Sequence, residues 1–201
     1  MSTSHDHIDQ LTTLGRAKGF LGREFLTWIW YIAETSRERL KLPVDSRDLE
    51  VDLWVDDRLV LEGTAAMSHQ NVMKGGDPSH SREAAASLST GKTVRELKLG
   101  LRVKDGGEYS AILGCDDLNP RSLKLPSPEP QEGQDGEKKS AASLPLAERL
   151  QATATFAGIL DALFARFLDT RVAPEWEKTV LSDMREWIKQ RQNKQDSGTL
   201  H

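Results

Sequence analysis

The chain has 201 residues, a net charge of −4 at pH 7 and a hydrophobic fraction of 37%. This length suffices for one substantial core, and the acidic balance gives the molecule as a whole no attraction to nucleic acid or anionic membranes, so such binding needs a local basic face. The single cysteine, Cys115, excludes an intramolecular disulfide and suits a reducing compartment. Because the sequence shows no apolar signal core and no membrane-length apolar stretch, we expect a cytoplasmic protein without membrane association.

The stretch over residues 19–34 is the most aromatic part of the chain. Its apolar residues recur at the three-and-four spacing of a helical face, and further aromatic residues widen that face until little polar surface remains. The members are Leu21, Phe25, Leu26, Trp28, Ile29, Trp30, Tyr31 and Ile32. The pattern predicts a buried core helix, which continues as a solvated segment through Arg39 and ends at Pro43.

Alternation of apolar and polar residues predicts strands after this helix. Residues 49–55 alternate at period two, Asp56-Asp57 is expected to form a turn, and residues 59–61 return as the second arm of a hairpin. A third strand is expected over residues 64–72. We thus expect the sheet to begin as a hairpin.

A short helix and a second hairpin are expected next. The helix covers residues 82–89 and is stopped by Gly91. Residues 92–104 form the clearest strand of the chain, Asp105-Gly106-Gly107 predicts a tight turn, and residues 109–113 return beside it. The middle of the chain therefore predicts an antiparallel meander with one inserted helix.

The last third of the chain predicts a linker followed by two helices. Residues 127–143 are rich in Pro, Gly, Glu, Gln, Lys and Ser and bury too little apolar area to order themselves. A long helix over residues 146–170 carries a broad apolar stripe that includes Leu150, and a final helix begins after Pro174. We expect an α+β fold in which an antiparallel meander packs on the aromatic helix. Its parts are a lead-in at 1–18, the α+β core at 19–126, a disordered linker at 127–143, a helical hairpin at 144–193 that packs on the core, and a frayed tail at 194–201.

Three motifs suggest catalytic or metal chemistry, and each has a simpler explanation. Gly91-Lys92-Thr93 resembles the end of a phosphate-binding loop, but Ala86 stands where that motif needs glycine and the order of elements is reversed. The acidic pairs at 56–57 and 116–117 suit a hard cation, yet such pairs are typical of turns. His69, His80 and Cys115 lack the spacing of a metal site or a nucleophile partner. We therefore expect no catalytic residue, no metal, no cofactor and no enzymatic activity.

Basic residues gather on one face of the strand at 92–104 and in the segment that follows it. They are Lys92, Lys98, Arg102, Lys104, Arg121 and Lys124. An exposed sheet face of this kind suits a phosphate backbone without reading bases. An ordinary solvated strand face gives the same pattern, and Glu96 dilutes its charge. The six residues are the candidates for contact with DNA.

Three segments taken together resemble the carboxyl-terminal half of the recombination-associated RdgC family. They are the aromatic helix at 19–34, the glycine-lysine that opens the strand at 91–99, and the acidic and lysine-bearing segment at 116–126. The resemblance spans roughly residues 19–126. It implies a non-catalytic protein that binds double-stranded DNA without sequence preference, assembles as a ring-like dimer and restrains recombinase filaments.

The resemblance also raises a question of assembly. The chain begins at what would be the middle of a full-length family member, and its acidic charge departs from what encircling DNA alone requires. We expect a nucleoid-associated, RdgC-like protein that makes weak, non-specific contact with double-stranded DNA as a homodimer or with a separate amino-terminal-half partner. The alternative is a protein-interaction module without nucleic-acid binding, whose candidate partner residues are Trp176 and Trp187 in the last helix.

Overall fold

The computed structural model describes residues 21–63, 70–75, 82–126 and 144–196. The expected lead-in at 1–18, the expected linker at 127–143 and the histidines His69 and His80 lie outside these ranges. A helix over residues 21–35 opens the described chain. It is followed by β1 (Leu40–Val44), β2 (Arg47–Glu62), β3 (Gln70–Lys74), α2 (Arg82–Ser89), β4 (Thr93–Val103), β5 (Gly107–Gly114), β6 (Arg121–Lys124), α3 (Leu146–Val172), a π-helical turn (Trp176–Val180) and α4 (Leu181–Asp196).

The strands form one antiparallel sheet in the order β1-β2-β4-β5-β6, with β3 also paired to β2. The long strand β2 pairs with β1 near its beginning and with β3 near its end, and both lie on the edge opposite β4. The predicted α+β class and antiparallel meander are confirmed. The turn at Asp105-Gly106-Gly107 joins β4 to β5, and Gly91, whose φ is +83°, follows α2 as expected.

The predicted hairpin at residues 49–61 is wrong, because this segment is the single strand β2. The acidic pair Asp56-Asp57 forms a bulge between the ladder pairs Val55–Leu99 and Leu59–Leu97. Both carboxylates contact the ammonium of Lys98 on β4, at 2.8 and 2.9 Å. The pair therefore bends the strand without reversing it, since β-bulges kink a ladder but preserve its direction.

The first helix ends earlier than predicted. It stops at residue 35, and residues 40–44 form the edge strand β1 instead of a helical extension. Leu42 and Val44 are buried while Pro43 is exposed, and a proline is tolerated on an edge strand because its missing N–H faces no partner. Asp45 and Ser46 then adopt φ values of +47° and +63°, which is typical of a two-residue hairpin turn.

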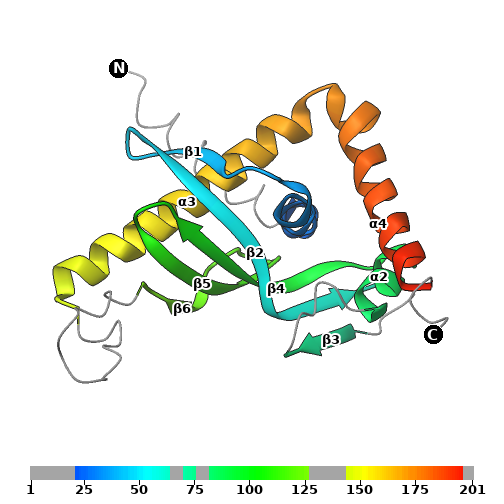
Figure 1. Ribbon diagram of the computed structural model, residues 1–201, viewed down its shortest axis with the longest axis horizontal. Helices are drawn as coiled ribbons and strands as arrows, with labels where there is room; N and C mark the ends of the chain where they lie inside the picture. Colours follow the sequence, from blue (N-terminus) through cyan, green and yellow to red (C-terminus); the bar gives the residue numbers. More distant parts are fainter. Residues whose placement is uncertain (1–20, 64–69, 76–81, 127–143, 197–201) are drawn as a thin grey trace, which may run out of the picture.

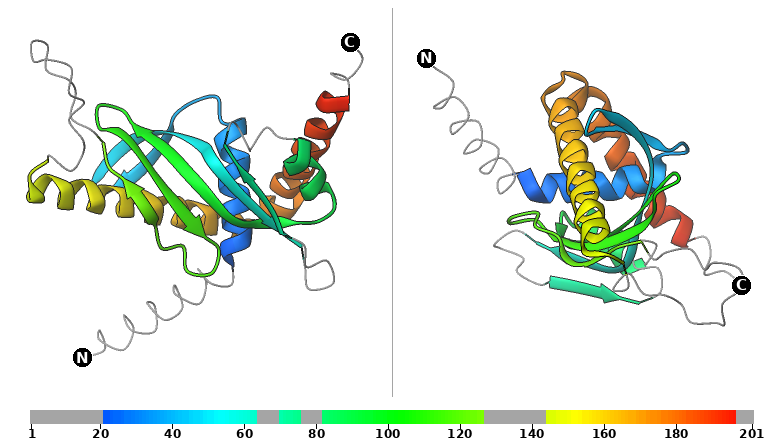
Figure 2. Two further views of the ribbon diagram at one scale, coloured as in Figure 1. Left: turned by 90° about the horizontal axis from the view of Figure 1, so that it is seen from below. Right: turned by 90° about the vertical axis from the view of Figure 1, so that its left-hand side faces the viewer.

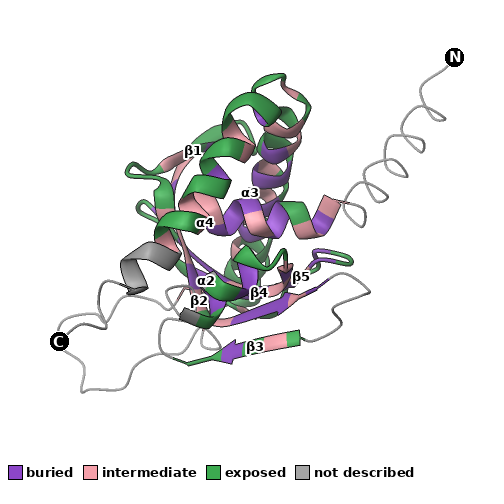
Figure 3. Cartoon of the chain, turned by 90° about the vertical axis from the view of Figure 1, so that its right-hand side faces the viewer, coloured by how far each residue is buried: buried purple, intermediate pink, exposed green. Residues whose placement is uncertain are grey.

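The helix over residues 21–35 and α3 pack against one face of the sheet, which curves around them (Figures 1 and 2). Phe25 contacts Phe164 and Phe167 of α3, with ring centroids 5.0 and 5.5 Å apart. The inward residues of β2, β4 and β5 complete a single core cluster, and Figure 3 shows buried residues between the helices and the sheet. The prediction of a buried aromatic helix is confirmed.

The two carboxyl-terminal helices form a bent arm over the core. α3 crosses the sheet, and α4 turns back toward α2 (Figure 1). Leu150, predicted in the buried stripe of α3, is 62% exposed, because the first turns of this helix run past the sheet (Figure 2). Within the described residues, no helix combines the length and apolarity needed to cross a membrane.

Candidate functional site: an arginine cluster on the open sheet face

The face of the sheet turned away from the helices carries polar and charged side chains. We call it the open sheet face. On β4, the core residues Leu97, Leu99 and Leu101 alternate with outward positions, as the period of two requires. The open sheet face includes Glu50, Asp52, Trp54, Asp56, Glu62, Arg95, Glu96, Lys98, Gly100, Arg102, Glu108, Ser110, Arg121 and Lys124.

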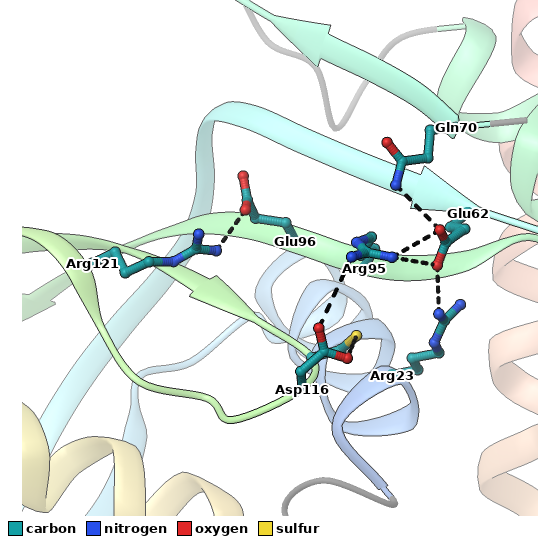
Figure 4. A network of polar contacts seen from close by, with 8 residues as sticks. Arg23, Glu62, Gln70, Arg95, Glu96, Asp116 and Arg121 are labelled. Carbon is teal, nitrogen blue, oxygen red and sulfur yellow. Dashed lines mark hydrogen bonds and ion pairs between the residues drawn. The ribbon is translucent and has the colours of Figure 1, made fainter.

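Four arginines meet two carboxylates at one end of this face, and we call this group the arginine cluster. Glu62 at the end of β2 forms ion pairs with Arg23 of the first helix and with Nη1 of Arg95, the latter at 2.8 Å (Figure 4). Glu96 pairs with Arg58 of β2 and with Nη2 of Arg121, the latter at 2.5 Å. Each carboxylate thus lies between two guanidinium groups.

A second bulge brings these side chains together. Val60 pairs with Glu96, but Leu61 pairs with Val94, so Arg95 is an extra residue on β4. Val94 and Leu97 are both fully buried, and the two residues between them therefore both point outward. Bulges re-aim side chains in this way, and here the bulge places Arg95 beside Glu62 while Glu96 faces Arg58.

The carboxylates of the cluster lie deeper than its cations. The side chains of Glu62 and Glu96 are 17% and 13% exposed, whereas those of Arg23, Arg58, Arg95 and Arg121 are 40%, 30%, 40% and 58% exposed. The cluster counts four cations against two carboxylates, and the side chain of Asp116, which is 80% exposed and lies 4.0 Å from Arg95, adds a third carboxylate at the surface. With four cations against three carboxylates, the group keeps a net positive charge, although the protein as a whole is acidic.

The surroundings stabilise the charged forms of these carboxylates. A hydrogen bond from Gln70 and further bonds from Arg95 and Arg23 lower the pKa of Glu62. Burial raises the pKa of Glu96, but hydrogen bonds from Arg58 and Arg121 outweigh this effect and leave the pKa lowered. The hydrogen bonds that Arg95 donates to Glu62 in turn raise the pKa of Arg95. Glu62, Glu96 and Arg95 therefore stay charged at neutral pH.

The six predicted DNA-contact residues have different surroundings. Arg121 belongs to the arginine cluster, and Lys124 is exposed on β6 with no ion pair among the described residues. Lys92 donates to the side chain of Asn71 at 3.1 Å. The other three are paired with nearby carboxylates: Lys98 with Asp56 and Asp57, Arg102 with Glu108, and Lys104 with Glu50.

The two predicted partner residues pack within the fold. Trp176 is 3% exposed and stacks edge-on against Phe167. Trp187 is half-buried against Trp30 and Tyr31, and its indole donates to Glu34 at 3.3 Å. Both rings thus hold α4 and the turn before it against the core, and little of either is presented to a partner.

The residues considered for other chemistry have structural partners. Cys115 is buried, and burial raises the pKa of its thiol. The backbone N–H of Lys92 bonds to the carbonyl of Ser87, which fixes the Gly91-Lys92-Thr93 segment as a helix stop before β4. A cavity of about 80 Å³, lined in part by Ile32, Arg37 and Leu53, lies beside the end of the first helix. Among the described residues, no three His, Cys, Asp or Glu side chains converge as metal ligands.

The sequence did not predict three members of the arginine cluster, nor Trp54 on the open sheet face. Arg23 and Arg58 come from other elements than the basic strand, and Arg95 counts as inward-facing by simple alternation. Trp54 was assigned to a half-buried strand without a role. The only signal for Arg95 is the adjacency of two charged residues, Arg95 and Glu96, within an otherwise alternating strand, which is a mark of a bulge.

No protein-family model, curated protein or solved structure matches this chain.

Proposed function

We propose that this protein is a non-catalytic, RdgC-like component of DNA recombination that contacts the backbone of double-stranded DNA through its arginine cluster, as part of a homo- or hetero-assembly. The single observation that carries the proposal is the layered cluster, in which exposed guanidiniums lie above less exposed carboxylates. The resemblance of residues 19–126 to the RdgC family supports the biological setting.

The geometry suits phosphate better than a base edge. A guanidinium has five N–H donors in a planar fork, and those that a carboxylate does not use remain available to a second anion. Glu62 and Glu96 hold the guanidiniums in place beforehand, which lowers the entropy lost on binding. Contacts of this type position a protein on DNA but carry no sequence information.

The rest of the open sheet face contributes little to this contact. Lys98 and Arg102 each lie against a carboxylate that is at least as exposed as they are. Lys104 is more exposed than its partner Glu50, but this single pair is electrically neutral. A phosphate approaching Arg102 meets Glu108 at the same depth. The contact is therefore local and weak, and an assembly that repeats it gains affinity through multivalency.

The test is fluorescence anisotropy with labelled random double-stranded DNA at low salt. The variant Arg95→Gln/Arg121→Gln leaves each carboxylate with one guanidinium, from Arg23 or Arg58, and so preserves the anchoring pairs. We expect it to lose about tenfold in affinity. Arg102→Gln is the control, because it removes from the same face one guanidinium that is about as exposed as that of Arg121. Equal losses in both variants, or none in either, contradict the assignment of the site.

The second candidate function is a protein-interaction module that binds no nucleic acid. The observation that favours it is the balance of charge outside the arginine cluster. Lys98 pairs with Asp56 and Asp57, Arg102 pairs with Glu108, and Lys104 pairs with Glu50. Trp54 lies among these pairs on the open sheet face. Alternating charge suits a protein surface better than a polyanion. The anisotropy titration separates the two functions, since the interaction module leaves labelled double-stranded DNA unbound at low salt even if sedimentation velocity shows concentration-dependent mass.

A further inference from the structure

Trp54 is distinguished from the other four tryptophans by its position. Trp28, Trp30 and Trp176 are buried in the core cluster, and Trp187 packs against it. Trp54 lies on the open sheet face, outside this cluster, between the outward positions of Asp52 and Asp56. Trp54 is of intermediate burial and lies outside the core cluster, so its indole contributes little to the core while part of its surface remains accessible to a ligand.

The indole of Trp54 packs over a glycine of the neighbouring strand. Gly100 pairs with Trp54 across β2 and β4, and a Cβ added at Gly100 would lie 2.2 Å from both Cε2 and Nε1 of the indole. The ring therefore lies directly over the backbone of β4 and is supported by the sheet. The same cross-strand row continues through Ser110 to Lys124. An aromatic ring supported in this way loses little freedom when a ligand stacks on it.

We infer that Trp54 is a stacking platform for an unpaired nucleobase of DNA whose phosphates are held by the arginine cluster. This inference rests on the proposed function and extends it from the backbone of the duplex to DNA with single-stranded character. Sheet-face aromatics flanked by cations are the common device for binding single strands, because every base offers a π-face. Lys98 and Arg102 stand two residues on either side of Gly100 on the same face, but each is paired with a carboxylate, so the cations assigned to the phosphates are those of the arginine cluster.

The distance between Trp54 and the arginine cluster suits one continuous strand of DNA. Gly100 and Glu96 are four residues apart on β4, which corresponds to about 13 Å along a strand. Lys98 lies between them, and Lys124 ends the row that contains Trp54. The cationic surface of the arginine cluster, on the same face, favours a polyanion over a protein as the ligand that reaches both. In a duplex the bases are stacked inside and unavailable to Trp54.

The experiment compares three labelled ligands: a short oligothymidylate, an abasic strand of the same length, and a duplex. We expect Trp54→Ala to weaken binding of the oligothymidylate about tenfold and to leave the other two unchanged. Trp54→Phe should retain most of the affinity, since a phenyl ring still stacks. Gly100→Ala should behave like Trp54→Ala, because its Cβ displaces the indole. Leu150→Ala, an exposed apolar residue on α3, is the control.

Each contrary result has a distinct meaning. Equal losses of Trp54→Ala on all three ligands show a structural role and overturn the inference, as does no loss on any. A change in sedimentation without a change in DNA binding identifies a protein interface and also overturns it. This inference alone is contradicted if the wild-type protein binds the duplex and the abasic strand but binds the oligothymidylate no more tightly than the abasic strand. Wild-type protein that binds no DNA contradicts the proposed function as well.

Discussion

At the scale of single residues, the arginine cluster depends on two carboxylates that are less exposed than the cations they anchor. Glu62 receives bonds from Arg23, Arg95 and Gln70, and Glu96 receives them from Arg58 and Arg121. Without these carboxylates, four guanidiniums close together would repel one another. The same residues therefore serve stability and the proposed binding surface.

The lowered pKa of Glu96 makes stability depend on acid pH. A carboxyl group whose folded pKa lies below its ordinary value of 4.5 stabilises the fold above that value and loses this contribution as pH falls through the folded pKa. We expect the free energy of unfolding, measured by urea titration, to fall between about pH 5 and pH 3. In Glu96→Gln this fall should be shallower, because glutamine does not titrate. Identical slopes in the two proteins would contradict the role assigned to Glu96.

At the scale of elements, the helix over residues 21–35 approaches the end of β5 so closely that it requires a glycine. A Cβ at Gly22 would lie 1.8 Å from the carbonyl oxygen of Cys115, a backbone atom that cannot rotate away. We expect Gly22→Ala to destabilise the protein by about 3 kcal/mol or more in urea unfolding. Gly158→Ala in α3 is the matched control, since its Cβ meets only the Cγ1 methyl of Val44, at 2.7 Å, and should cost less.

Helix α4 is fixed to the first helix through Glu34. This carboxylate accepts a hydrogen bond from the indole of Trp30 at 2.5 Å and pairs with Arg191 of α4. Both charged side chains are largely buried, and burial lowers the pKa of Arg191 to about 10. We expect Glu34→Ala to destabilise the protein by about 3–5 kcal/mol, because it removes the carboxylate that a buried cation faces.

An exposed ion pair on the same helix provides the control for Glu34. Glu24 pairs with Arg171 at 2.7 Å, and both side chains are at least one-third exposed. We expect Glu24→Ala to cost less than about 1 kcal/mol, as is usual for surface pairs. Urea unfolding of both variants gives the comparison, and similar costs for the two would show that the Glu34 pair does not fix α4.

The sequence predicted the elements whose patterns are local and missed those decided by tertiary contacts. The aromatic helix, α2, the β4–β5 hairpin and the two last helices follow from periodicity and turn residues. Asp56-Asp57 has the composition of a turn, but Lys98 on the neighbouring strand compensates both carboxylates within β2. Strand β1 was not predicted: Leu40, Leu42 and Val44 alternate as in a strand, but the proline among them was interpreted as the end of the helix.

The candidate site was predicted only in part for the same reason. Arg121 and the basic character of the face could be read from the chain, but pairing with carboxylates on other strands could not. Arg95 was not predicted as an outward residue, because strict alternation assigns it to the core face and the bulge at this position could not be foreseen. Arg23 joins the cluster from a helix that precedes its partner Glu62 by 39 positions.

At the scale of the whole molecule, charge is distributed unevenly. The protein carries a net charge of −4, yet the arginine cluster forms a local cationic surface. Any DNA binding should therefore be restricted to this surface and opposed elsewhere by repulsion. The consequence is weak binding by the isolated chain and stronger binding when an assembly presents several clusters to one duplex.

The most direct test of this account is the salt dependence of binding to random double-stranded DNA. The logarithm of the association constant falls linearly with the logarithm of salt concentration, and each neutralised phosphate adds about 0.9 to the slope. We expect Arg95→Gln/Arg121→Gln to reduce the slope by about 2 relative to the wild-type protein, and Arg102→Gln to leave it nearly unchanged. A slope that is the same in the wild type and the cluster variant would show that the arginine cluster does not contact DNA.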